Sequence, residues 1–167
     1  NSFIGSKSSK SSGSSCFTDF TNGKASSTTW PDEGIILSSG PAESILDAGA
    51  TTNDILGIPG DADLNGINPV VTNDACFIEF DISCPSNTAL LIDLNFVFAS
   101  EENGGSPGSF NDIFGLFVDD INIALIPGTN LPVNIENVAV NAAATAASGY
   151  VIPGGSDNTP VFGYTGL

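Results

Sequence analysis

The sequence predicts an all-β fold, in detail a jelly-roll-like β-sandwich with at most one or two short helices. Three observations support this prediction. Short apolar or alternating runs recur along the chain, and 19 glycines and 10 prolines are spread between them. Helical periodicity is poor throughout. The chain has 167 residues, of which 41% are hydrophobic and 13% charged, so it can close a hydrophobic core.

The N-terminal half of the domain contains the first expected strands. Gly34–Leu37 is a short apolar run that ends at the turn residues Ser38–Pro41. Residues 75–82 alternate between apolar and polar side chains, which is typical of a strand with one buried face. The residues on the apolar face are Cys76, Ile78, Phe80 and Ile82. Residues 90–99 form a nearly continuous apolar run and are expected to be a central strand.

The C-terminal half continues the pattern. Residues 113–118 read as a strand that is followed by Asp119-Asp120 and by a second run over 121–126, which predicts a tight hairpin turn at the two aspartates. Residues 133–140 alternate again, with Val133 and Ile135, and also Val138 and Val140, directed inward. Two other segments could form short helices: 42–48 and 142–147.

The chain divides into two parts by composition. Residues 1–15 include the stretch GSKSSKSSGSS, which contains no side chain for a core, and we expect a flexible, serine- and lysine-rich N-terminal segment. Residues 16–167 are expected to form a single β-sandwich domain. No internal repeat is visible. The chain opens without a recognisable signal peptide, so we interpret it as the mature form of a secreted protein.

The charge is strongly one-sided. Nineteen acidic residues face three lysines, with no histidine and no arginine, for a formal net charge of −16. This charge repels phosphate backbones and anionic lipids, so nucleic-acid binding is not expected. No apolar run reaches the roughly 20 residues of a membrane helix, so membrane insertion is not expected either. Without imidazole, the remaining ligands are oxygens, the set that calcium prefers.

One candidate calcium segment is Asp61-Ala-Asp63-Leu-Asn65-Gly66. Its D-x-D-x-N-G spacing matches the opening half of an EF-hand loop, where alternate oxygens surround one ion. The second half does not match, because Thr72 occupies the position of the bidentate glutamate. We therefore expect a Ca²⁺ loop that is completed by acids from elsewhere, with a solvated Asp/Asn turn as the alternative.

The acids that could complete the site flank a glycine-rich loop. Glu101 and Glu102 end an apolar run, and Asp112 follows the loop. Adjacent carboxylates at the end of an apolar strand are unfavourable unless a cation neutralises them. A glutamate pair also suggests glycoside hydrolysis. Neighbours in an extended chain point to opposite faces, however, so Glu101 and Glu102 are a poor catalytic pair, and we do not expect an enzyme.

Three cysteines are present: Cys16, Cys76 and Cys84. Cys76 and Cys84 lie in one strand-like run and would be about 26 Å apart when extended, so they cannot pair within one strand. We therefore expect a disulfide between Cys16 and one of the other two. The remaining cysteine either pairs outside this chain or stays buried and free.

A single tryptophan, Trp30, lies near Phe17, Phe20 and Pro31. These residues could line a sugar-binding platform, although core packing is the commoner fate of a lone tryptophan. The alternative function is therefore a calcium-dependent module that binds a polysaccharide or another surface.

Several motifs in one order resemble the choice-of-anchor L family of secreted surface domains. They are GIILSSG (34–40), GDADL (60–64), NDA (73–75) with FIEFD (77–81), FVFASEE (96–102), FNDIFG (110–115), NIALIPGT (122–129) and PVNI (132–135). The resemblance spans about residues 16–166. It implies a β-rich extracellular domain of cell-surface proteins and brings no enzymatic activity with it.

Family members usually continue beyond the motif that resembles FGYTG (162–166) into further strands, whereas this chain stops at Leu167. We expect either a truncated molecule or strands supplied by another chain. In the second case the unfilled sheet edge would accept a strand from a neighbour, and the odd cysteine could lock subunits together in a fibre. Self-association into a fibre or matrix is the partner prediction that follows.

Overall fold

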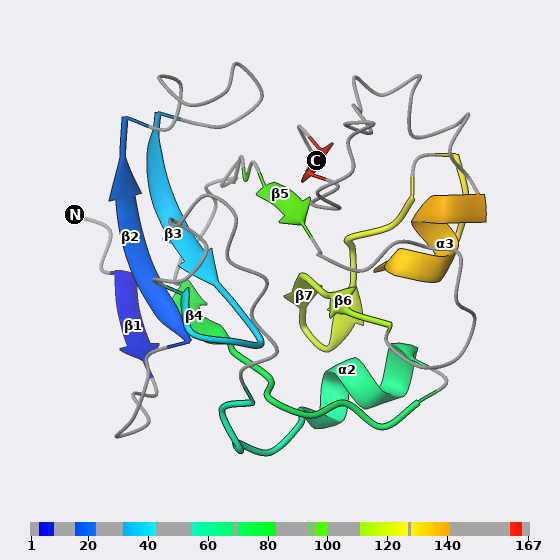
Figure 1. Cartoon of the computed structure of the whole chain (residues 1–167), viewed down its shortest axis with the longest axis horizontal. Helices are drawn as coiled ribbons and strands as arrows, with labels where there is room; N and C mark the ends of the chain where they lie inside the picture. The colour runs from blue at the N-terminus through cyan, green and yellow to red at the C-terminus, as the bar shows by residue number, and fades with distance from the viewer. Residues whose placement is uncertain are drawn as a thin grey trace, which may run out of the picture.

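The computed structural model describes residues 4–8, 16–22, 32–42, 55–68, 70–82, 94, 96–99, 111–126, 128–140 and 161–164. These residues contain ten strands and two short helices (Figure 1). The strands are β1 (Ile4–Ser8), β2 (Phe17–Thr21), β3 (Glu33–Leu37), β4 (Ile78–Ile82), β5 (Phe96–Ala99), β6 (Ile113–Phe114), β7 (Phe117–Val118), β8 (Ile121–Asn122), β9 (Val133–Asn134) and β10 (Val161–Tyr164). The helices are α2 (Ala62–Ile67) and α3 (Ile135–Val140).

The strands pair antiparallel in two-stranded sheets, namely β1–β4, β2–β3, β5–β10, β6–β9 and β7–β8. The structure is thus mostly strands with two short helices, as the sequence predicts at the coarse level. The sheets in the described part of the chain are small, so the jelly-roll-like sandwich stays a prediction.

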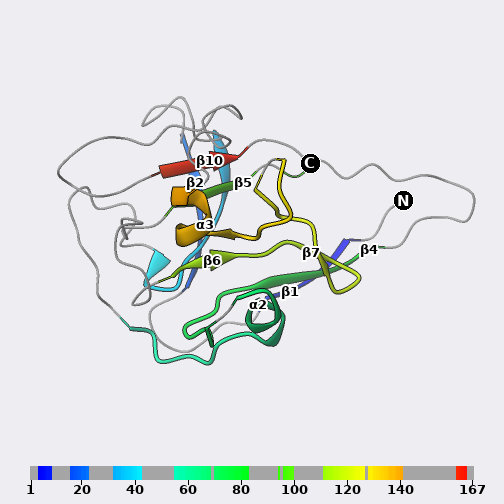
Figure 2. The same ribbon diagram turned by 90° about the vertical axis from the view of Figure 1, so that its right-hand side faces the viewer.

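The hydrophobic core gathers around β5. The apolar positions Phe96 and Phe98 alternate along this strand, and Phe98 is 8% exposed. The Phe96 and Phe114 rings lie with their centroids 4.4 Å apart in a tilted arrangement. The buried core residues besides Phe98 are Ala124, Ile126, Val133, Ile135 and Val138. Figure 1 shows β5 between the β2–β3 pair and α3, and Figure 2 shows β10 beside β5.

The strand predicted over 113–118 is interrupted. β6 and β7 are separate strands with different partners, β9 and β8. The break falls at Gly115, where an added Cβ would lie 3.0 Å from the Phe117 Cζ atom. Glycine lets the Phe117 ring lie close to the backbone at this break.

The strand predicted over 121–126 is also shorter than expected, because β8 covers Ile121–Asn122 alone. The Asn122 Oδ1 atom accepts hydrogen bonds from Leu116 N and Ala124 N, each at 3.1 Å. This side chain takes over backbone donors and so competes with a continuing ladder. Leu125 then forms an isolated bridge with Pro132.

The strand predicted over 133–140 is wrong beyond Asn134, where the chain turns into α3. Asn134 Oδ1 accepts a hydrogen bond from Asn137 N at 2.8 Å, the geometry of an N-cap. Ile135 and Val138 are three residues apart and each 2% exposed, so they lie on one helix face. The inward direction of these side chains was predicted, but their spacing also fits a helix.

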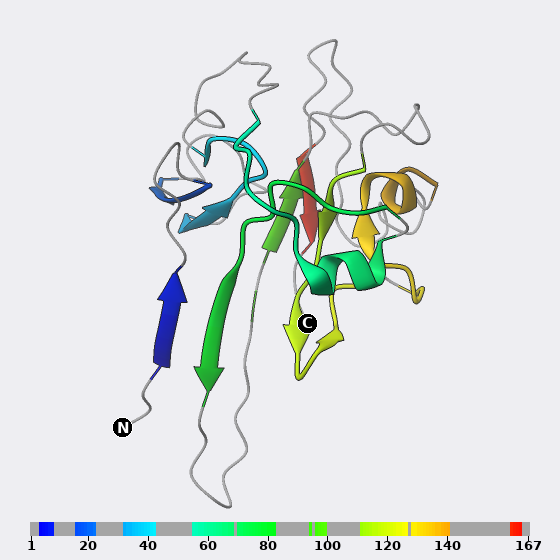
Figure 3. The ribbon, with the colours of Figure 1, turned by 90° about the horizontal axis from the view of Figure 1, so that it is seen from below.

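β1 lies within the segment that was expected to be flexible. Residues 4–8 pair with β4, and Figure 3 shows the two strands side by side. Glycine and serine accept an extended backbone without steric conflict, and β4 supplies main-chain partners. Within the segment expected to be flexible, residues 4–8 thus form a strand, and the expectation for the segment as a whole stays a prediction. The rest of residues 1–15, the possible helix at 142–147 and residues 43–48 of the other lie outside the described residues.

Candidate functional site

The predicted calcium segment begins with a helix N-cap. Asp61 has an extended backbone, and its Oδ1 atom accepts hydrogen bonds from Asp63 N at 2.9 Å and Leu64 N at 3.0 Å. Asp63 adds a negative charge in the first turn, where the helix dipole favours it. The same short polar residues that suggest an EF-hand loop are therefore good helix initiators, and α2 follows.

Thr72 closes this segment. Its Oγ1 atom accepts a hydrogen bond from Asp61 N at 3.0 Å and lies 2.9 Å from Asn65 Oδ1, to which its hydroxyl donates. Asn65 Oδ1 also accepts from Thr72 N at 2.6 Å. The residue that fails as a twelfth calcium ligand is therefore a structural partner of the first and fifth positions.

Hydrogen bonds between the segments that precede and follow α2 hold the two ends of this region together. Asp74 is buried and has a positive φ of 52°, and its Oδ1 atom accepts a hydrogen bond from Ile58 N at 2.8 Å. Ile58 in turn accepts from Asp74 N at 3.0 Å. A Cβ on Gly60 would collide with the Thr72 carbonyl group, so only glycine permits this approach. We call residues 58–75 the α2 loop.

The EF-hand-like loop conformation expected for residues 61–66 is wrong, because Ala62–Ile67 is helical. A helix turns about 100° per residue, so Asp61 and Asn65 fall on one side and Asp63 on the other. In addition, Oδ1 of Asp61 and Oδ1 of Asn65 already accept backbone hydrogen bonds. The Oδ1 atoms of Asp61 and Asn65 therefore serve the α2 loop itself.

Asn111 connects the α2 loop to the core. Its Nδ2 atom lies 3.3 Å from Oδ1 of Asn68, the C-cap residue of α2, and its Oδ1 accepts from Glu136 N at 3.3 Å. The neighbouring Asp112 accepts a hydrogen bond from Ile135 N through its carbonyl oxygen at 3.2 Å. The structure therefore brings the predicted ligand Asp112 to the segment that joins α2 and α3.

Four predicted residues fall outside the described part of the chain: Glu101, Glu102, Cys84 and Trp30. Among the described residues, no three acidic or cysteine side chains are grouped so that they could hold a metal ion. The metal assignment of Asp61, Asp63, Asn65 and Asp112 therefore stays a prediction.

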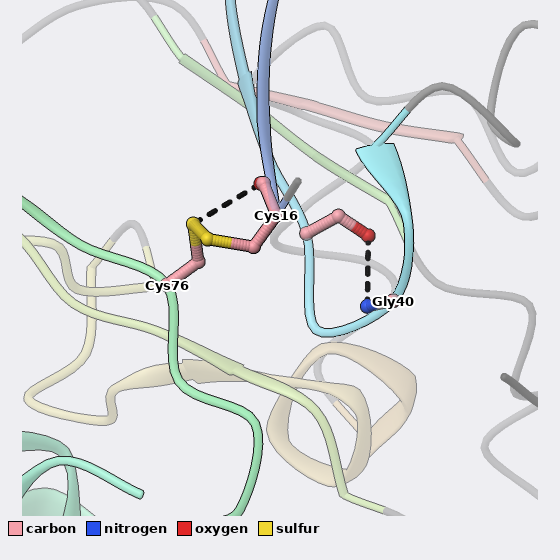
Figure 4. The surroundings of a disulfide bond; sticks show 4 residues. Cys16, Gly40 and Cys76 are labelled. Atoms are coloured by element: carbon pink, nitrogen blue, oxygen red, sulfur yellow. Dashed lines mark hydrogen bonds between the residues drawn. A yellow bond between two sulfur atoms is a disulfide. The ribbon is translucent and has the colours of Figure 1, made fainter. Parts of the chain in front are cut away.

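A disulfide joins Cys16 to Cys76, with their Cα atoms 5.9 Å apart (Figure 4). It is one of the two pairings that the sequence analysis favoured. The bond fastens the residue before β2 to the segment that leads into β4. Cys16 O also accepts from Ser38 N at 2.9 Å, which extends the β2–β3 ladder. The Cys76 Sγ atom lies 3.1 Å from this carbonyl oxygen, but an oxidised sulfur carries no hydrogen, so this is a contact and not a hydrogen bond.

The hairpin predicted at Asp119-Asp120 is confirmed. Val118 pairs with Ile121 across the turn, and the two aspartates have positive φ values of 48° and 64°. Two consecutive left-handed residues are typical of a type I′ turn. Val118 and Ile121 are 51% and 66% exposed.

Sequence reasoning assigned no structural role to Thr72, Asp74 or Asn111. The signal for Asp74 was the Asn73-Asp74 pair, which is typical of turns with a positive φ. Thr72 and Asn111 act through partners that are distant in the sequence, so no local pattern marks them.

Comparison with known proteins gives one match. The family model of the choice-of-anchor L domain matches residues 2–165, nearly the whole chain. A search of the curated proteins and a search of the solved structures found no significant match. The described helices are all too short, or too polar, to span a bilayer.

Choice-of-anchor domains are typically extracellular or located at the cell surface, which agrees with the secreted location expected from the sequence. The match includes the segments that form the α2 loop, β5, the β7–β8 hairpin and the start of α3. This chain is a member of the choice-of-anchor L domain family.

Proposed function

We propose that this chain is a non-enzymatic structural or adhesive domain that is stabilised by Ca²⁺ outside the cell. In this role it is a subunit of an extracellular fibre or matrix, or decorates a cell surface. The observation that carries the proposal is the large excess of carboxylates in an extracellular domain, with a net charge of −16. Calcium is a hard cation that binds oxygen ligands and neutralises such charge.

The charge distribution supports a cation requirement. Lys7 is the one basic residue among those that the structure describes, and every other charged residue there is an acid. Exposed like charges repel one another and destabilise the compact state. A divalent ion that binds the folded chain more tightly than the unfolded chain removes part of this repulsion and raises stability.

The ligand set remains the predicted one: Asp61, Asp63, Asn65, Glu101, Glu102 and Asp112. Capping by Oδ1 of Asp61 is compatible with a cation at the second carboxylate oxygen. The Asn68–Asn111 contact supports ligands from both the α2 loop and Asp112, because it connects the two segments. Glu101 and Glu102 follow β5 by two and three residues, since the strand ends at Ala99.

A structural role without catalysis is supported by the side chains available. The sequence contains no histidine and no arginine, so it cannot form a histidine-activated nucleophile or a guanidinium clamp. The side-chain oxygens of Asp61 and Asn65 accept hydrogen bonds from backbone and hydroxyl groups of the α2 loop, which is the pattern of a structural element.

Thermal unfolding tests the calcium requirement. The melting temperature is measured with Ca²⁺, with chelator, and with Na⁺ at equal ionic strength. At a free Ca²⁺ concentration of 100 times the dissociation constant, one site adds about 2.7 kcal/mol to the free energy of unfolding. This raises Tm by roughly 5–10 °C in a domain of this size. Electron microscopy of the same samples shows whether fibres form with Ca²⁺.

Matched variants distinguish specific Ca²⁺ binding from general screening of the negative charge. Asp63→Asn, Asp112→Asn and the pair Glu101→Gln/Glu102→Gln should reduce the Ca²⁺-dependent shift. Asp32→Asn removes one charge from an exposed position before β3 and should leave the shift intact. If Na⁺ reproduces the shift, or if Asp32→Asn reduces it equally, the domain has no specific calcium site.

A further inference from the structure

The pairing of β1 with β4 has features of an exchangeable contact. The register places Ile4 opposite Ile82 and Lys7 opposite Glu79 in an antiparallel ladder. β4 lies apart from the described core, because none of its residues belongs to the buried cluster. An isolated pair of strands is marginally stable in water, so separating β1 from β4 leaves the core contacts intact.

Charge complementarity identifies what β4 accepts. Residues 1–15 contain Lys7 and Lys10 and no acidic residue, whereas no basic residue follows Lys24. β4 presents Glu79 and Asp81, which lie opposite Lys7 and Gly5 in the register. Two copies of a chain with net charge −16 repel each other, so the positive N-terminal segment is the part that another copy's β4 would attract.

β4 also keeps apolar surface uncovered beside its pairing edge. Phe80 and Ile82 lie on one face of the strand and are 46% and 47% exposed. Ile82 is opposite Ile4 in the register. Exposed apolar side chains next to a strand-pairing edge are a feature of surfaces that a further chain covers.

A short connection without bulky side chains precedes Cys16, the residue before β2. Residues 9–15 are serine, lysine and glycine alone, and they separate Ser8 from Cys16. Cys16 is held at Cys76, two residues before β4 begins. Eight Cα steps span at most about 27 Å, so the segment can serve the β4 of its own chain or that of an adjacent copy.

We propose that β1 is a donor strand that pairs with β4 of a second copy of this chain. The two ends of the contact are different surfaces, β1 on one copy and β4 on the next, so the contact is heterologous. A heterologous contact that does not close into a ring builds an open filament. The inference rests on the proposed structural function and supplies its partner and its contact.

Cysteine cross-linking of mixed chains tests the exchange. Lys7→Cys and Glu79→Cys are made separately in a Cys84→Ser background, mixed at high concentration in a glutathione buffer, and analysed by non-reducing electrophoresis. Peptide mass spectrometry identifies the linked residues. The control mixture is Ser8→Cys with Asp81→Cys, because the register places Ser8 opposite Ile78 and Asp81 opposite Gly5.

If β1 is exchanged, the mixture should form a covalent dimer with a disulfide between positions 7 and 79. Its yield should be about tenfold higher than that of the dimer in the control mixture, because strand pairing raises the local thiol concentration. A double variant with both cysteines in one chain reports pairing within a copy. A link in the double variant without one in the mixture would show that β1 stays on its own chain and would overturn the proposal. Absence of the 7–79 link from both samples would overturn it too. Neither result bears on the calcium-dependent melting, so the two proposals fail separately.

Discussion

Removal of the Cys16–Cys76 disulfide should destabilise the domain about as much as a large-to-small substitution in its core. The bond joins residues 60 positions apart. In the unfolded state, a cross-link of this span removes chain entropy worth about 4 kcal/mol at 25 °C. The closed segment contains β2, β3 and the whole α2 loop, so all of these gain freedom when the bond is absent.

The variant is Cys16→Ala/Cys76→Ala, compared with its parent in a Cys84→Ala background so that no free thiol can exchange. Alanine is preferable to serine because Cys16 is 8% exposed and a buried hydroxyl adds its own penalty. The assay is equilibrium urea unfolding at neutral pH, followed by fluorescence and circular dichroism.

We expect the free energy of unfolding to fall by about 4 kcal/mol and the m-value to rise, because the unfolded chain exposes more surface without the cross-link. A fall below about 1 kcal/mol with an unchanged m-value would refute the reasoning. It would mean that the unfolded ensemble already holds β2 and the β4 region together, or that the two cysteines do not pair.

The remaining predictions concern two glycines of the α2 loop and one aspartate in the turn between β7 and β8. Gly60→Ala should destabilise by about 1–3 kcal/mol, since its Cβ would meet the Thr72 carbonyl group. The matched control Gly66→Ala has open space around the new Cβ and should stabilise α2 by about 0.5–1 kcal/mol; urea midpoints compare the two, and equal effects would contradict the described closure. Asp120→Gly should stabilise by roughly 0.5–1 kcal/mol, because φ is 64° at this position: relief of left-handed strain, about 1–2 kcal/mol, exceeds the added chain entropy of glycine, about 0.5–1 kcal/mol. A lower melting temperature for Asp120→Gly would indicate that the aspartate side chain has a role beyond the turn.

Local patterns predicted much of the β structure. β3, a strand that includes β5 and the hairpin at Asp119-Asp120 were all predicted from apolar runs and turn residues. Each depends on contacts between residues that are close in sequence, or on one face of one strand. The family was also predictable, because its motifs are short and occur in a defined order.

The misassignments share one cause. The D-x-D-x-N-G spacing fits both a calcium loop and an N-capped helix, and residues 133–140 fit both a strand and α3. A distant partner decides each case, namely Thr72 for the α2 loop and the buried cluster for Ile135 and Val138. Local propensities differ by less than the free energy of burying such side chains, so packing overrides them.

The sequence by itself determined the charge, the absence of histidine and arginine, the family and the mainly β character of the fold. The tertiary structure alone decided which cysteine pairs with Cys16, that Asn111 connects α2 to α3, and that Ile4–Ser8 pairs with β4. Composition and local pattern are properties of neighbouring residues. A disulfide partner or a strand partner depends on loop closure over many residues, and only the folded chain brings those groups within bonding distance.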